Sequence, residues 1–81
     1  LSLNETFSIR THKKTMEIVN HNPTQTLYVT LSSMEGKQLI DEKSIGEREL
    51  FDFSTFSEGI YIVRLKIGER YFSNKIVLTN D

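Results

Sequence analysis

The 81-residue sequence predicts an all-β domain, a small immunoglobulin-like antiparallel β-sandwich of about seven strands. Apolar residues alternate with polar ones at a period of two along most of the chain, as at Leu27, Val29 and Leu31. Alanine, the strongest helix former, is absent, and most patterned positions hold Val, Ile, Thr, Phe or Tyr, which suit a half-buried sheet surface. Short turn-forming segments separate the alternating runs.

Each alternating run is expected to form one strand. Between the second and third runs, Pro23 has no backbone donor and a fixed φ, which predicts a loop over residues 20–24. Gly36 and Gly59 stand between later runs, where a positive φ would allow a tight connection. The predicted strands are, in chain order, Glu5–Thr11, Thr15–Asn20, Thr26–Leu31, Lys37–Lys43, Glu47–Phe53, Gly59–Ile67 and Arg70–Leu78.

The last two strands are predicted to form a hairpin around Gly68 and Glu69, which pairs Ile67 with Arg70 and Leu65 with Phe72. Gly59 and Gly68 are both expected to adopt positive φ. Counting from the turn places two sets of residues on opposite faces. The inward set is Tyr61, Val63, Leu65, Phe72, Ile76 and Leu78, and the outward set is Ile60, Ile62, Arg64, Lys66, Tyr71, Ser73, Lys75 and Val77.

Two inward positions carry polar groups that need partners. Asn74 falls on the inward face, so we expect either a hydrogen bond to its amide or a β-bulge that shifts the strand. Tyr61 lies two residues after Gly59, a position like that of the tyrosine corner of immunoglobulin-like sandwiches. Its hydroxyl is therefore expected to reach nearby backbone, in a structural role.

Composition argues against several function classes. Ten Lys and Arg residues against eleven Asp and Glu leave a formal charge of −1, which disfavours non-specific binding to nucleic acid. No apolar run approaches the ~20 residues of a transmembrane helix, and there is no Cys for a disulfide or a thiolate-ligated metal. His12 and His21 have no metal-site spacing, and no Ser lies in a Gly-x-Ser-x-Gly motif. We expect no catalysis, cofactor or bound metal.

Three stretches carry a resemblance to a known family. Residues 52–65 and 71–78, together with the turn at residues 32–39, resemble the C-terminal sorting domain of the type IX (Por) secretion system of Bacteroidetes. The residues that match its motifs are Gly36, Lys37, Leu39, Gly59, Tyr61, Val63, Gly68, Lys75, Ile76, Val77 and Leu78.

The resemblance implies a non-catalytic signal at the end of a longer secreted protein, with residues 1–81 as one domain. It implies that the type IX translocon reads the domain, and that the translocon's sortase-like protease often removes it. The cargo would then be at the cell surface, with anionic lipopolysaccharide as one attachment partner, or released outside the cell. The alternative is an immunoglobulin-like accessory domain that binds carbohydrate or protein, for which Tyr28 and Tyr71 are the outward aromatic residues.

The outward face of the last hairpin is the candidate docking patch. Arg64, Lys66, Tyr71 and Lys75 are predicted to lie close together there, where three cations and an aromatic ring could bind an acidic partner or phosphate groups. The other interpretation is a solvated sheet face whose Lys and Arg residues oppose aggregation.

Overall fold

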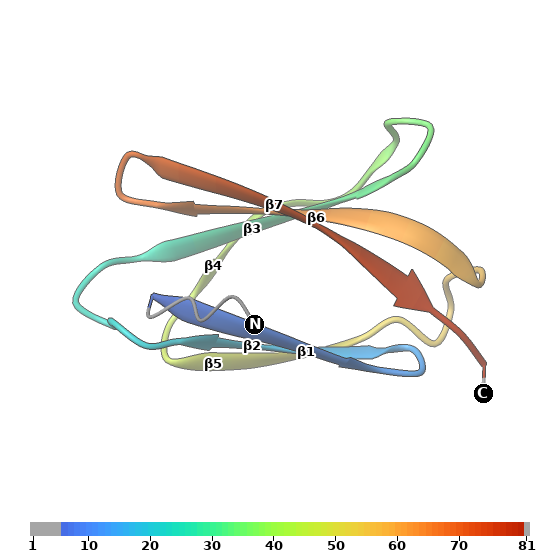
Figure 1. Cartoon of the computed structure of the whole chain (residues 1–81), viewed down its shortest axis with the longest axis horizontal. Helices are drawn as coiled ribbons and strands as arrows, with labels where there is room; N and C mark the ends of the chain where they lie inside the picture. Colours follow the sequence, from blue (N-terminus) through green and yellow to red (C-terminus); the bar gives the residue numbers. More distant parts are fainter. Residues whose placement is uncertain (1–5, 81) are drawn as a thin grey trace.

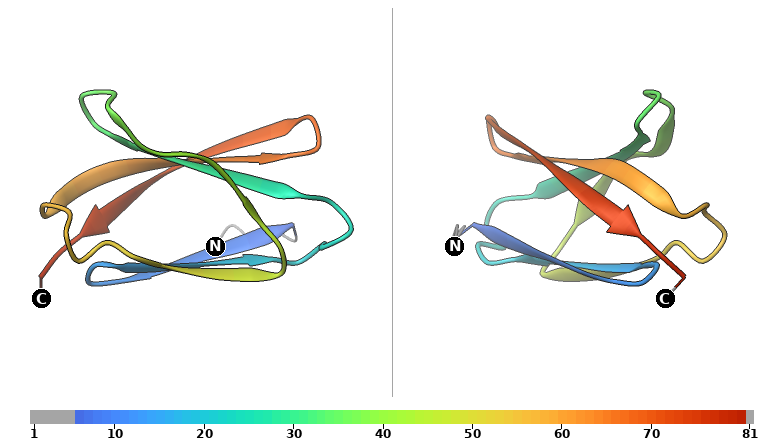
Figure 2. Two further views of the ribbon diagram at one scale, coloured as in Figure 1. Left: turned by 180° about the vertical axis from the view of Figure 1, so that it is seen from behind. Right: turned by 45° about the vertical axis from the view of Figure 1, so that its right-hand side comes forward.

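The computed structural model describes residues 6–80 as two stacked antiparallel sheets (Figure 1 and Figure 2). One sheet has the strand order β1-β2-β5 and the other the order β4-β3-β6-β7. The predicted all-β class and the seven strands are confirmed; the expected start of the first strand at Glu5 lies outside the described residues. The strands are β1 (Phe7–His12), β2 (Thr15–Asn20), β3 (Leu27–Ser33), β4 (Gln38–Ile45), β5 (Arg48–Asp52), β6 (Gly59–Ile67) and β7 (Arg70–Leu78).

The hairpin of β6 and β7 has the predicted register. Ile67 pairs with Arg70 and Leu65 with Phe72, and the pairing continues without a shift to Gly59 and Leu78. Gly68 has a φ of 59° and Gly59 a φ of 151°, which confirms that both adopt a backbone conformation that L side chains rarely take. The turn chemistry therefore sets which side chains of this hairpin face the core.

The core lies between the two sheets and is filled by the inward residues of all seven strands. At one end, the Phe53 and Phe56 rings stack at a centroid distance of 5.1 Å, and Tyr61 packs beside Phe56 at 6.1 Å. The Tyr61 hydroxyl donates a hydrogen bond to the Ser57 carbonyl oxygen at 2.7 Å, as expected. This bond lets the buried ring keep its polar atom paired.

Both expectations for Asn74 are wrong. Asn74 pairs with Val63 in an unshifted register, yet its side chain is exposed. The reason is that β7 is the edge of a four-stranded sheet that faces only three strands, so part of its inward face is uncovered. Phe72, two residues before, is half-buried against the ring of Phe7 at 4.9 Å. Water can satisfy the Asn74 amide without a bulge.

The fourth strand begins and ends later than predicted. Lys37 belongs to the preceding turn, where its carbonyl oxygen accepts a hydrogen bond from the Ser33 backbone at 2.8 Å and its own N–H donates to Ser33 Oγ at 3.1 Å. β4 then shifts register twice against β3, and Glu42 has a φ of 33°. A bulged edge strand of this kind blurs the alternation from which its bounds were predicted.

Candidate functional site

The outward residues of β6 and β7 form one continuous surface, here called the outer hairpin face. It consists of the set predicted above, Ile60, Ile62, Arg64, Lys66, Tyr71, Ser73, Lys75 and Val77. Lys66 pairs directly with Tyr71 and Ile62 with Lys75, so the register brings together all four residues of the candidate docking patch. Among the large apolar and aromatic residues that the structure describes, Tyr71 is the most exposed, at 73%.

A third strand adds an aromatic side chain to this surface. Tyr28 of β3 pairs with Lys66, so Tyr28, Lys66 and Tyr71 form one row across three neighbouring strands. The Lys66 ammonium nitrogen lies 6.0 Å from the centroid of the Tyr28 ring and 5.8 Å from that of Tyr71. Rings at this distance attract an ammonium group and restrict where it can lie. Sequence reasoning placed Tyr28 outward but could not place it beside Lys66, because that contact depends on the pairing of β3 with β6.

The outer hairpin face is cationic. It carries Arg64, Lys66 and Lys75 and no carboxylate, and none of these three cations forms an ion pair with a described residue. Within the strands of the same sheet the carboxylates belong to Asp41 and Glu42 of β4, at the opposite edge, and Glu69 lies in the turn between β6 and β7. Because the whole chain carries a charge of −1, this concentration of positive charge reflects the placement of residues and not the composition.

The outer surface of the other sheet has mixed charge instead. Arg10 of β1 lies opposite Glu17 of β2 in the strand register, and the Arg48 Nε lies 3.3 Å from a Glu17 carboxylate oxygen. Positive groups there have negative neighbours. The two sheet surfaces therefore present different electrostatic faces to a partner.

The sorting-motif residues gather mainly at one end of the larger sheet. Gly59 pairs with Leu78 and Tyr61 with Ile76, which joins the motif at the start of β6 to that at the end of β7. Ser33 pairs with Tyr61, so the turn that contains Gly36 and Lys37 leaves the sheet at the same end. Leu39 is half-buried against the core, Val63 is fully buried in mid-strand, and Gly68 forms the turn at the opposite end.

These motif residues divide into two physical groups. Tyr61, Val63, Ile76 and Leu78 are buried, so a partner cannot touch their side chains while the domain is folded. Lys75 and Val77 of β7 point outward and are exposed. On this hairpin the inward motif residues hold the fold, and the outward ones are accessible.

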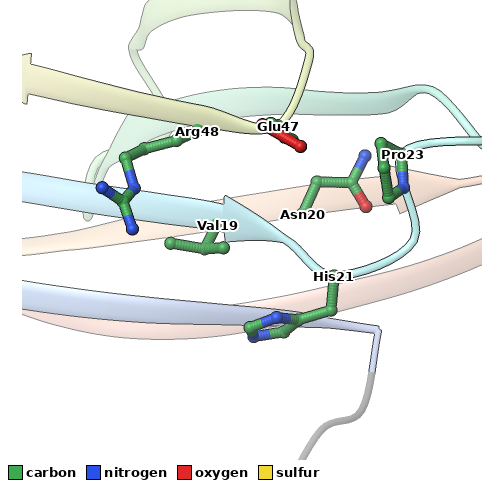
Figure 3. Close-up of a pocket in the computed structure, with 6 residues that line it drawn as sticks. All are labelled: Val19, Asn20, His21, Pro23, Glu47 and Arg48. Atoms are coloured by element: carbon green, nitrogen blue, oxygen red, sulfur yellow. The ribbon is translucent and has the colours of Figure 1, made fainter.

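A shallow depression lies between the end of β2 and the start of β5, as Figure 3 shows. Two of its polar side chains, those of Asn20 and Arg48, already have partners within the domain. The Asn20 side chain donates to the Gln25 carbonyl oxygen at 2.9 Å and accepts from the Asn22 backbone at 3.0 Å, and Arg48 pairs with Glu17. The labelled side chains spread along the surface and do not converge on a common point. The Asn20 bonds hold the turn that forms one side of the depression.

Over residues 6–80, no group of three or more His, Asp or Glu side chains is placed to hold a metal ion. The same part of the chain contains no helix that is long and apolar enough to span a membrane.

Comparison with known proteins gives a family and a fold. A model of the secretion system C-terminal sorting domain matches residues 4–79. The chain is also similar to a crystal structure from Bacteroides vulgatus of a protein with an immunoglobulin-like β-sandwich fold, with a TM-score of 0.77 at 12% identity over 89% of this chain and 82% of that one. This similarity confirms the predicted immunoglobulin-like sandwich. None of the curated proteins compared with the chain matches it.

Proposed function

Because the chain belongs to the family of type IX secretion system C-terminal sorting domains, we propose that it directs a cargo protein through the outer-membrane translocon to the cell surface. The family is one of secretion signals, a non-catalytic kind of domain, and membership implies export across the outer membrane by the type IX machinery. The family match over residues 4–79 is the observation that carries the proposal. Beyond export, we propose three further steps: delivery to the cell surface, removal of the domain by the sortase-like protease, and attachment of the cargo to anionic lipopolysaccharide.

The fold is compatible with this function. A sandwich held by a continuous core presents rigid surfaces, and a rigid surface loses little conformational entropy when a partner binds. A sorting signal needs only to be recognised, so it needs no cleft for a substrate.

Localisation of a reporter tests the proposal. Residues 1–81 are fused behind a signal peptide and a fluorescent protein, in a bacterium with a working type IX system and in a strain without the translocon. We expect the reporter outside the cell only in the competent strain. Retention in the periplasm of both strains, with the domain folded, would reject the sorting function.

We further propose that the docking patch of Arg64, Lys66, Tyr71 and Lys75 is the surface that the secretion machinery reads. None of the three cations forms an ion pair with a described residue, which leaves them available to an acidic partner. The competing interpretation, a solvated face that opposes aggregation, predicts no effect on export when the charges are removed.

Neutralisation of two charges separates these interpretations. Arg64→Gln with Lys75→Gln is expected to lower export by about tenfold, because several charged contacts act together at such a surface. Arg10→Gln with Arg48→Gln removes the same charge from the opposite sheet and is the matched control, with export unchanged. Equal export from both double variants would reject the docking patch and support the interpretation as a solvated face.

The alternative of a carbohydrate-binding accessory domain has weaker support. Sugar binding favours an uninterrupted aromatic platform, whereas the Lys66 ammonium lies between the Tyr28 and Tyr71 rings. Specific glycan binding that is lost in Tyr28→Ala or Tyr71→Ala would favour this alternative.

A further inference from the structure

We propose that the partner is a protein that contacts the outer hairpin face at two ends, with carboxylates over the Lys66 end and an apolar surface over Ile60 and Val77. The inference rests on the proposed function and specifies the chemistry of the partner. It adds Tyr28 and the apolar end to the docking patch.

The apolar end is a cross-strand pair. Ile60 and Val77 lie directly opposite each other on β6 and β7, with 47% and 54% of their surfaces exposed. Ile62, the next outward residue of β6, is half-buried beside them and pairs with Lys75, so one of the three cations borders the apolar end. Two opposed β-branched side chains offer a joint apolar surface that water covers poorly and a partner can bury.

The exposed leucine of the other sheet has a different setting. Leu50 is 67% exposed but pairs with Glu17, and Arg48 and Asp52 are the next outward residues of its own strand. Scattered apolar residues among charges are normal on protein surfaces. Leu50 therefore serves as a control for the Ile60 and Val77 pair.

At the cationic end, the Lys66 ammonium lies against two aromatic rings before any partner binds. Lys66 lies between the Tyr28 and Tyr71 rings, and Arg64 is the next outward residue of β6. Tyr and Arg are enriched at the centres of protein interfaces, where restrained side chains lose less entropy on binding. Carboxylates are the groups that would complement this end.

The distance between the two ends favours a protein over a lipid surface. Lys66 and Ile60 are six residues apart on β6, which is about 20 Å at ~3.3 Å per residue. Lys75 precedes Val77 by two residues on β7, about 7 Å at ~3.3 Å per residue, so a membrane that buried Ile60 and Val77 would have to keep this nearby charge at its phosphates. Three cations also give only a modest attraction to anionic lipid. A protein can present acidic and apolar regions side by side at this spacing.

Substitution of the apolar end tests the proposal. Ile60→Thr with Val77→Thr keeps β-branching at both positions, and thermal melting confirms that the variant folds. We expect export of the reporter fusion to fall by about tenfold, whereas Leu50→Thr leaves it unchanged. Unchanged export from the folded double variant overturns the apolar contact.

Site-specific photocrosslinking identifies what covers the face. A photoreactive residue at Tyr71 or at Val77 of the fusion is expected to crosslink to the same translocon protein in the competent strain, and one at Leu50 is not. Three results overturn the inference: crosslinks to lipid alone, crosslinks from the two positions to different proteins, or no crosslink while the fusion is exported normally. Failure of the proposed function is distinct, because the unaltered fusion would then not be exported at all.

Discussion

At the scale of single residues, burial decides which side chain of the hairpin matters for stability. Leu65 is 1% exposed and lies on the inward face of β6. Leu65→Ala is expected to lower the free energy of unfolding by about 2 to 5 kcal/mol, through lost transfer energy and a residual cavity. Leu50→Ala, at an exposed position, should change it by less than about 0.5 kcal/mol. Urea denaturation measures both, and equal midpoints would contradict the inward register.

The residues that sequence reasoning missed share one physical cause. Side-chain direction along β6 and β7 follows from period two and the Gly68 turn, so the faces of Arg64 and Val77 could be predicted. Contacts between strands that are distant in sequence could not be predicted. Tyr28 beside Lys66 depends on the pairing of β3 with β6, and the exposure of Asn74 depends on how far the smaller sheet extends.

At the scale of strands, position within the sheet determines protection. β6 is paired on both sides, with β3 and with β7, whereas β4 is an edge strand with two register shifts. Backbone amides of β6 are therefore expected to exchange with deuterium much more slowly than those around Glu42 of β4. Hydrogen exchange resolved by residue measures this order. Protection of β4 equal to that of β6 would contradict the strand order.

The same difference explains which strand bounds the sequence could predict. β2, β6 and β7 have the predicted bounds, because clear alternation and defined turns limit them. The bounds of β4 depend on the hydrogen bonds between Lys37 and Ser33 and on a bulge. Neither leaves a periodic signal in the sequence.

At the scale of the whole molecule, we propose that the folded surface is the sorting signal. Two observations on the motif residues support this view. Four of them are inaccessible in the folded domain: Tyr61, Val63, Ile76 and Leu78. Two others on the hairpin strands, Lys75 and Val77, become neighbours of Ile62 and Ile60 only through the pairing of β6 with β7. The sequence predicted the family and the sandwich, since motifs and alternation are local properties. The order of strands within the sheets, and with it the three-strand surface, had no such local signal.

Export of the Leu65→Ala fusion tests this claim most directly. Leu65 is the last residue of the stretch 52–65 but is not among the residues that match the family's motifs, so the substitution leaves those matching residues unchanged while it removes a buried side chain. The measurement is the exported fraction of intact fusion in the competent strain, beside the folded fraction of the same variant in urea-free solution. We predict that export falls in proportion to the folded fraction. Normal export of a largely unfolded variant would show that the linear motif is read, and would contradict the account.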